Sequence, residues 1–284
     1  MTAESKLKIG IAFPMVIPAD IDGNIRRMAP LVEEAARQGA RVVVFSECGL
    51  NGYDLHGRGL ATAFATNAAP LQAVADLARA HQVVLLVGFF EREGNAIYNT
   101  AAAIYPDGRR VFQRKHNAGE IEAALNQIAC GPAERQYFDI DGFRCAMVIC
   151  ADYGVPKLFE DMAAAHCDVA FGLIAGAGSV GWGFYQVEMH TGGRRQAYFD
   201  LEAKQPHYPK DMVEKSLALD LAQVAVNQRG WVPEMGYFHP GCGFVVDRTG
   251  EVTATIPGRF IFEHLRPEVA VGWVTKPGAA HNAL

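Results

Sequence analysis

Three observations predict an α/β fold. Uninterrupted apolar runs, such as Val83 to Phe90, are typical of strands that are covered on both faces. Segments with helical periodicity alternate with these runs along the chain, as they do in βαβ units. Two hairpin patterns, one in each half of the chain, indicate a pseudo-symmetric pair of halves. Half of the 284 residues are hydrophobic, so we expect a single domain over residues 1–284.

The first half of the chain shows the alternation clearly. The expected elements are a strand at Lys8–Phe13, a helix at Asn24–Gln38, a strand at Arg41–Phe45, a helix at Pro70–His81, a strand at Val83–Phe90, and a hairpin of Ile97–Ile104 with Arg110–Lys115. Gly39 stops the first helix, and Pro70 suits the first turn of the second. The turn at Pro106-Asp107-Gly108 has the residue types that close a hairpin.

The second half repeats the rhythm. The expected elements are a buried strand over Ala146–Cys150, a helix that opens at Pro156, a strand at Val169–Ile174, a helix from about Lys210, a strand at Ala222–Asn227, and a hairpin of Gly243–Asp247 with Glu251–Ile256.

Three segments lack a clear period. Residues 117–136 are expected to be an active-site loop with at most one short helix, because glycine and proline interrupt them. Residues 175–209 are too long for an idle loop and predict either a functional lid or an oligomer contact. The C-terminal tail, residues 259–284, carries apolar side chains without a regular pattern, and we expect it at an oligomer interface.

Chemically active side chains follow three of the predicted strands. Cys150 ends an apolar run that then breaks into small and polar residues, Glu47 follows the strand at Arg41–Phe45, and Lys115 ends the first hairpin. A lone cysteine is more often a buried apolar residue than a nucleophile. A cysteine nucleophile needs a base and a cation, however, and Glu47 and Lys115 offer both. The three together therefore predict a nucleophilic site.

Several motifs carry a resemblance to a known family. They are Val44-Phe45-Ser46-Glu47-Cys48-Gly49-Leu50-Asn51-Gly52-Tyr53, Ile97-Tyr98-Asn99-Thr100, the Pro106-Asp107-Gly108 turn with Arg114-Lys115-His116, Cys150-Ala151-Asp152 with Pro156 and Leu158, and Ala225-Val226-Asn227 followed by Gly243-Phe244-Val245-Val246-Asp247. Together they resemble the carbon-nitrogen hydrolases of the nitrilase superfamily over nearly the whole chain.

The resemblance implies an α-β-β-α sandwich and a catalytic triad of Glu47, Lys115 and Cys150, without a metal or an organic cofactor. It also implies a second glutamate between the lysine and the cysteine. Glu120 and Glu122 are both candidates, and we favour Glu120. The resemblance further suggests a homo-oligomer, at least a dimer.

The predicted substrate is a small amide or carbamoyl compound. Cys-Ala-Asp is closer to the amidase-like pattern of the family than to the Cys-Trp-Glu of true nitrilases, although a nitrile substrate is the alternative. Many amidase-like members carry a basic residue shortly after the aspartate, where this chain has Tyr153-Gly154. We expect the backbone N–H of Ala151 to help stabilise the oxyanion, and Tyr53 and Trp182 to line the substrate pocket.

Composition argues against other classes of partner. A formal charge of −5 without a basic stripe disfavours nucleic acid and anionic membranes as partners. The polar N-terminus lacks the apolar core of a signal peptide, and no apolar run could span a bilayer, so we expect a cytoplasmic protein. Six cysteines without zinc-like spacing and nine scattered histidines make a metal-dependent hydrolase the weaker alternative, and a non-catalytic binding protein a third.

Overall fold

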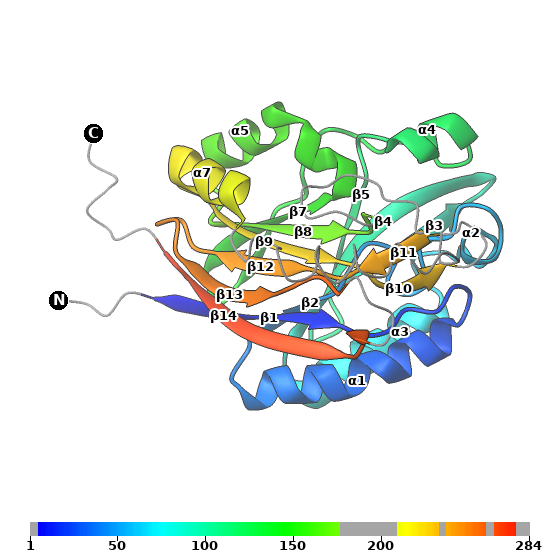
Figure 1. Cartoon of the computed structure of the whole chain (residues 1–284), viewed down its shortest axis with the longest axis horizontal. Helices are drawn as coiled ribbons and strands as arrows, with labels where there is room; N and C mark the ends of the chain where they lie inside the picture. Colours follow the sequence, from blue (N-terminus) through cyan, green and yellow to red (C-terminus); the bar gives the residue numbers. More distant parts are fainter. Residues whose placement is uncertain (1–4, 177–208, 233–236, 260–263, 277–284) are drawn as a thin grey trace, which may run out of the picture.

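The computed structural model describes residues 5–176, 209–232, 237–259 and 264–276. These residues form two six-stranded sheets that pack face to face between outer helices (Figure 1). Helices α1 (Ile21–Arg37) and α3 (Ala69–His81) cover the first sheet, and α5 (Pro156–Ala164) and α7 (Lys210–Leu219) cover the second. The predicted α-β-β-α sandwich is confirmed.

The strands fall into two equal sets. The first sheet contains β1 (Lys6–Phe13), β2 (Val42–Val44), β3 (Val84–Glu93), β4 (Ala96–Ile104), β5 (Arg110–Arg114) and β14 (Glu268–Thr275). The second contains β6 (Phe138–Ile140), β7 (Phe143–Ile149), β8 (Val169–Ile174), β9 (Ala222–Asn227), β12 (Gly243–Val246) and β13 (Val252–Ile256). The remaining elements are the ribbon of β10 (Arg229–Val232) and β11 (Tyr237–Pro240), the short helices α2 (Arg58–Ala61) and α4 (Glu120–Leu125), and the 3₁₀ turn η1 (Cys150–Gly154).

Both sheets repeat one strand pattern. The order is β14-β1-β2-β3-β4-β5 in the first sheet and β6-β7-β8-β9-β12-β13 in the second. In each, an antiparallel edge strand is followed by three parallel strands and then by an antiparallel hairpin. The two similar halves that the hairpins predict are therefore present.

The main core lies between the two sheets. Its side chains include Leu7, Ile9, Val44 and Leu86 from the first sheet and Met147, Ile149, Phe171, Leu173 and Val224 from the second. The alternate residues of the same strands, such as Val43 on β2, pack on the outer helices. Because both faces of these strands are covered, their sequences are continuously apolar. This burial explains why the strand predictions succeeded here.

The C-terminal tail differs from expectation. Residues 268–275 form β14, which pairs along the whole of β1 from Lys6↔Thr275 to Phe13↔Glu268. The period was hidden because small residues, Ala270 and Gly272, alternate with Val269 and Val271, so neither face stands out as polar. The prediction that the tail has no regular pattern is thus wrong for these residues, while its place at an oligomer interface remains a prediction.

Smaller differences concern the ends of elements. Helix α1 begins at Ile21, before Asn24, because the Asp20 carboxylate accepts a hydrogen bond from the Gly23 N–H at 3.1 Å and caps the helix. Strand β7 begins at Phe143 and forms an unpredicted hairpin with β6. Among the described helices, none has the length and apolar character needed to cross a membrane.

Candidate active site

The three predicted catalytic residues come from two different sheets. Lys115 directly follows β5, Glu47 lies three residues past β2, and Cys150 directly follows β7. Strand β5 runs in the same direction as β2, because β4 is antiparallel to both β3 and β5. Glu47 and Lys115 therefore emerge at one edge of the first sheet, and Cys150 reaches them from the second.

A glycine allows the Glu47 turn to pack closely on β3. A Cβ atom at Gly88 would lie 2.4 Å from the Cys48 nitrogen and 2.8 Å from the Glu47 Cα. Any larger residue would push the turn away from the sheet. The position of Glu47 thus depends on a residue 41 positions later in the chain, a separation that follows from the numbering.

Lys115 lies between two carboxylates. Its Nζ is 2.8 Å from Glu47 Oε1 and 2.7 Å from Glu122 Oε2. Lys115 is 3% exposed, Glu47 0% and Glu122 2%. An ammonium group buried to this extent requires compensating charge, which the two carboxylates supply.

Asn99 joins the two glutamates. Its Nδ2 donates to Glu47 Oε1 at 2.7 Å and to Glu122 Oε1 at 2.9 Å. Its backbone carbonyl accepts from the Lys115 N–H at 2.8 Å, which continues the β4–β5 pairing. Asn99 belongs to the sequence motif quoted above but received no predicted role. A polar residue in the middle of a strand that becomes alanine-rich was the available signal.

The second glutamate at the lysine is Glu122, and the preference for Glu120 is wrong. The Glu120 side chain is exposed at the first residue of α4, although it borders the cavity described below. Glu122 stands one half-turn further along and faces inward, where its Oε2 also accepts from the Gly119 N–H at 2.7 Å. A carboxylate three residues after a helix-capping position commonly makes this bond, which was the signal in the sequence.

The surroundings shift the pKa values of the two carboxyl groups in opposite directions. Burial raises the pKa of Glu47, and the Lys115 ammonium does not reverse the shift. Burial acts on Glu122 as well, but the Lys115 charge and hydrogen bonds from Lys115, Gly119 and Asn99 lower its pKa overall. Glu47 Oε2 accepts no hydrogen bond from the described residues. Such a separation is typical of a carboxyl pair in which one group carries protons and the other stays ionised.

Cys150 opens the turn η1 in a strained conformation. Its φ of 44° lies in the left-handed region, which residues other than glycine rarely occupy. Burial and the charge of Glu47 raise the pKa of its thiol above the ordinary range, while Lys115 and the Ala175 N–H act in the opposite direction. The thiol is therefore protonated at neutral pH and needs a base before it can attack.

A cavity of about 400 Å³ opens at Cys150. Its lining includes Tyr53, Lys115, Glu120, Cys150, Ala151 and Lys215. Two of the three predicted substrate-binding residues, Tyr53 and Ala151, thus border it, whereas Trp182 lies outside the described residues. Lys115 Nζ is also 5.9 Å from the centre of the Tyr53 ring. The described parts of the chain hold no group of three or more histidine, cysteine or acidic residues placed to bind a metal ion.

A match to a protein family decides the classification. The family model of the carbon-nitrogen hydrolases matches residues 10–255. The chain belongs to the carbon-nitrogen hydrolase family. This carbon-nitrogen hydrolase is also similar to curated proteins, at low identity. An arylacetonitrilase of Aspergillus niger is 26% identical over 40% of this chain and 37% of its own length. A nitrilase of Pyrococcus abyssi is 26% identical over 52% of this chain and 57% of its own length.

Solved structures of the superfamily share the fold. An amidase of Nesterenkonia sp. AN1 has a TM-score of 0.73 with 16% identity, covering 95% of this hydrolase and 90% of that chain. XC1258 of Xanthomonas campestris, a CN-hydrolase superfamily protein with an arsenic adduct in the active site, has a TM-score of 0.74 with 15% identity, covering 98% and 92%. Structures of two mutants of the Nesterenkonia amidase carry acrylamide or the acetamide moiety of fluoroacetamide on the active-site cysteine. The matched parts of the two curated relatives span 37% and 57% of their own length.

Proposed function

We propose that this chain hydrolyses the carbon-nitrogen bond of a small amide through a thioester on Cys150. The observation that carries the proposal is the charge arrangement at the cavity. Lys115 is held between Glu47 and Glu122, and Glu47 retains one carboxylate oxygen, Oε2, without a hydrogen bond from the described residues. A protonated thiol, a base with a raised pKa and a fixed cation are the three parts that covalent amide hydrolysis requires.

In the acylation half, Glu47 takes the thiol proton as Cys150 Sγ attacks the carbonyl carbon. Lys115 Nζ and the Ala151 N–H stabilise the oxyanion. The Ala151 N–H can do so because it lies in the first turn of η1, where backbone N–H groups have no partner inside the turn. The carbon-nitrogen bond then breaks, and Glu47 passes its proton to the departing nitrogen. Ammonia or an amine leaves, and the acyl group remains as a thioester.

In the hydrolysis half, Glu47 takes a proton from water, and the resulting hydroxide attacks the thioester carbon. The thiolate departs, Glu47 returns the proton to it, and the acid is released. One carboxyl group thus serves both halves, which suits a group whose pKa burial has raised. Glu122 keeps Lys115 in place and does not exchange protons.

Cys150-Ala151-Asp152 favours an amide over a nitrile, because these residues are closer to the amidase-like pattern of the family. The nitrilases among the curated relatives make nitrile hydrolysis the second candidate. A panel of small amides and their matched nitriles, assayed for ammonia and acid with Cys150→Ala as the blank, decides between them. Release of acid from nitriles alone would replace the amide proposal.

Fluoroacetamide offers a direct test of the nucleophile, since its acetamide moiety is attached to the active-site cysteine in a mutant of the Nesterenkonia amidase. We expect mass spectrometry of digested protein to find the acetamide group on Cys150 while activity falls. The buried Cys48 and Cys145 serve as internal controls. Loss of activity with Cys150 unlabelled would remove Cys150 from the mechanism.

We further propose a cytoplasmic homo-oligomer, at least a dimer. The half-buried outer residues of β14 at the edge of the first sheet support a second copy as partner. Sedimentation at micromolar concentration tests the assembly, and a species of 30.8 kDa would contradict it.

A further inference from the structure

Lys115 and Cys150 need a fixed relative position, although no strand pairing provides one. Lys115 follows β5 at the edge of the first sheet, and Cys150 follows β7 in the second. Hydrogen bonds between strands fix residues within one sheet, whereas two sheets packed face to face meet only through side chains. Something else must therefore hold the two reacting groups in register.

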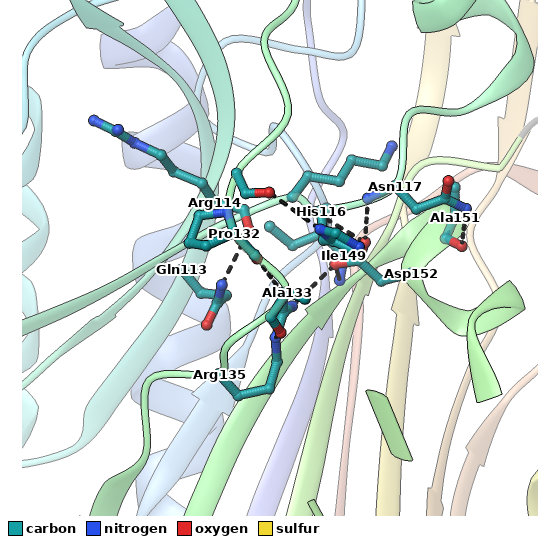
Figure 2. Close-up of polar contacts among 12 residues, drawn as sticks. Gln113, Arg114, His116, Asn117, Pro132, Ala133, Arg135, Ile149, Ala151 and Asp152 are labelled. Atoms are coloured by element: carbon teal, nitrogen blue, oxygen red, sulfur yellow. Dashed lines mark hydrogen bonds and ion pairs between the residues drawn. The ribbon is translucent and has the colours of Figure 1, made fainter. Parts of the chain in front are cut away.

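The buried carboxylate of Asp152 spans this gap. Its Oδ1 accepts hydrogen bonds from the backbone N–H groups of His116 and Asn117, at 3.0 and 2.8 Å, directly after Lys115. Its Oδ2 accepts from the N–H of Ile149 at 3.2 Å, directly before Cys150. Asp152 is 0% exposed. Figure 2 shows these bonds converging on one side chain from both segments.

Two further side chains complete the link. Asn117 Nδ2 donates to the Ala151 carbonyl at 3.0 Å, so the lysine segment also holds the nucleophile turn directly. Arg135 Nη1 lies 3.2 Å from Asp152 Oδ2, and its other nitrogens donate to the carbonyls of Pro132 and Ala133. The guanidinium thereby neutralises the buried carboxylate and attaches the loop before β6 to it (Figure 2).

We propose that Asp152 is a positioning residue that sets the distance between Lys115 and Cys150. This inference rests on the proposed function, in which the ammonium and the thiol act on the same carbonyl group. The carboxylate touches neither reacting group. It acts through the backbone of the residues next to them, and a displacement of about 1 Å in such a site costs on the order of a hundredfold in rate.

The chemistry of the site explains why a carboxylate is needed. Four donors surround the Asp152 oxygens, two on each. An asparagine has the same size, but its amide nitrogen would face donors on one side and leave them unpaired. Asp152→Asn therefore disrupts the link with little change in volume.

Asp247 provides a matched control. It is 1% exposed and also joins the sheets, because its Oδ1 accepts from the Thr275 N–H on β14 at 2.7 Å. It lies at the opposite end of the second sheet, since Val246 pairs with Gln223 at the start of β9, whereas Cys150 follows the end of the parallel strand β7. Asp247→Asn thus removes a similar link far from the site.

The experiment compares the two variants in the full-length protein on the best amide found. We expect Asp152→Asn to lower kcat about a hundredfold with KM changed less than about threefold, and Asp247→Asn to lower melting temperature without a comparable loss of kcat. Combining Asp152→Asn with Lys115→Ala should give a rate no lower than Lys115→Ala alone, because a displaced lysine is already lost. If Asp152→Asn does not fold, Asn117→Ala takes its place in the experiment. This variant leaves the carboxylate in position and should show a smaller loss of kcat.

The outcomes separate this inference from the proposed function. Equal kcat effects in Asp152→Asn and Asp247→Asn, or multiplying losses in the double variant, would overturn the positioning role while the triad stands. Undiminished turnover in Cys150→Ala or Lys115→Ala would instead overturn the proposed function itself.

Discussion

Two lysines border the same cavity, and their surroundings differ. Lys115 Nζ has carboxylate oxygens at 2.8 and 2.7 Å. Lys215 on α7 makes no ion pair with the described residues. Its Nζ lies 3.5 Å from the Tyr153 carbonyl oxygen and 3.9 Å from the centre of the Phe159 ring. Asp211, one turn earlier, acts on it only through its charge.

The two pKa values move in opposite directions. Burial lowers the pKa of Lys215, and the charge of Asp211 does not restore it. Burial acts on Lys115 too, but nearby negative charges, that of Glu47 first, outweigh it and hold its pKa well above the ordinary value. Desolvation alone therefore disfavours the charged form of a lysine, whereas two paired carboxylates keep a buried lysine charged. Of the two, Lys115 is the one suited to stabilise an oxyanion throughout the reaction.

The largest effect is expected at Glu47, because this carboxylate carries protons in both halves of the proposed reaction besides pairing with Lys115. Glu47→Gln keeps size and hydrogen-bonding reach but cannot carry protons, so turnover should fall about ten-thousand-fold. Ammonia release and thermal melting are measured on the same preparation. Near-normal turnover in the folded variant would move the proton carrier elsewhere.

Next in size is Lys115→Ala, which removes the permanent cation. We expect kcat to fall roughly a hundred- to a thousandfold. Melting temperature should also fall, because two buried carboxylates lose their counterion. Lys215→Ala is the matched control for losing a cavity lysine. An equal kcat loss in both variants would show that pairing with carboxylates does not set Lys115 apart from Lys215.

A smaller loss is expected at Glu122, where removal of one carboxylate weakens the hold on Lys115. Glu122→Gln should lower kcat about tenfold to a hundredfold. Glu120→Gln changes the same charge two residues away on the exposed face of α4 and should alter kcat less than about threefold. If the exposed residue proved the more sensitive, the geometry at Lys115 would not govern the rate.

His239 is a base that is buried without a carboxylate partner among the described residues. Burial lowers its pKa from 6.5 to about 4, and its Nε2 has no hydrogen-bond partner among the described residues. Its contribution to stability is complete above pH 6.5 and is lost as the pH falls toward about 4, because the unfolded chain then binds the proton more strongly. The shift corresponds to roughly 3 kcal/mol of unfolding free energy.

Chemical denaturation between about pH 7 and about pH 5 measures the larger part of this loss. In His239→Gln the pH dependence should shrink, with His56→Gln at an exposed position as control. An unchanged pH dependence in His239→Gln would show that other groups cause the acid sensitivity.

The smallest effect is expected at Lys215. Lys215→Met keeps most of the apolar stem and removes a charge that burial already disfavours, so kcat should change less than about threefold, and any change should appear in KM. Steady-state kinetics with charged and neutral amides check this. A large loss of kcat would place a second essential cation at the cavity.

The sequence by itself predicted the two halves, the layer architecture through its family resemblance, and the strand ends that carry Glu47, Lys115 and Cys150. The two halves and the strand ends follow from local information, because apolar runs, hairpin turns and interruptions of the apolar pattern can be recognised in consecutive residues. For Glu120 and Glu122 the sequence offered only the capping signal at Glu122, and the rotation of α4 against Lys115 shows which carboxylate pairs with the lysine.

Pairings between distant segments were decided only by the tertiary structure. Strand β14 was missed because its residues show no clear period, and its pairing with β1 joins segments more than 250 positions apart, a separation that follows from the numbering. The Asp152 link was missed because it joins backbone groups from two sheets, which no periodicity encodes. The need for a glycine at position 88 is likewise visible only in the tertiary structure, where the Glu47 turn packs against it. Local pattern thus specifies which residues can react, whereas contacts between distant segments fix their distances and pKa values.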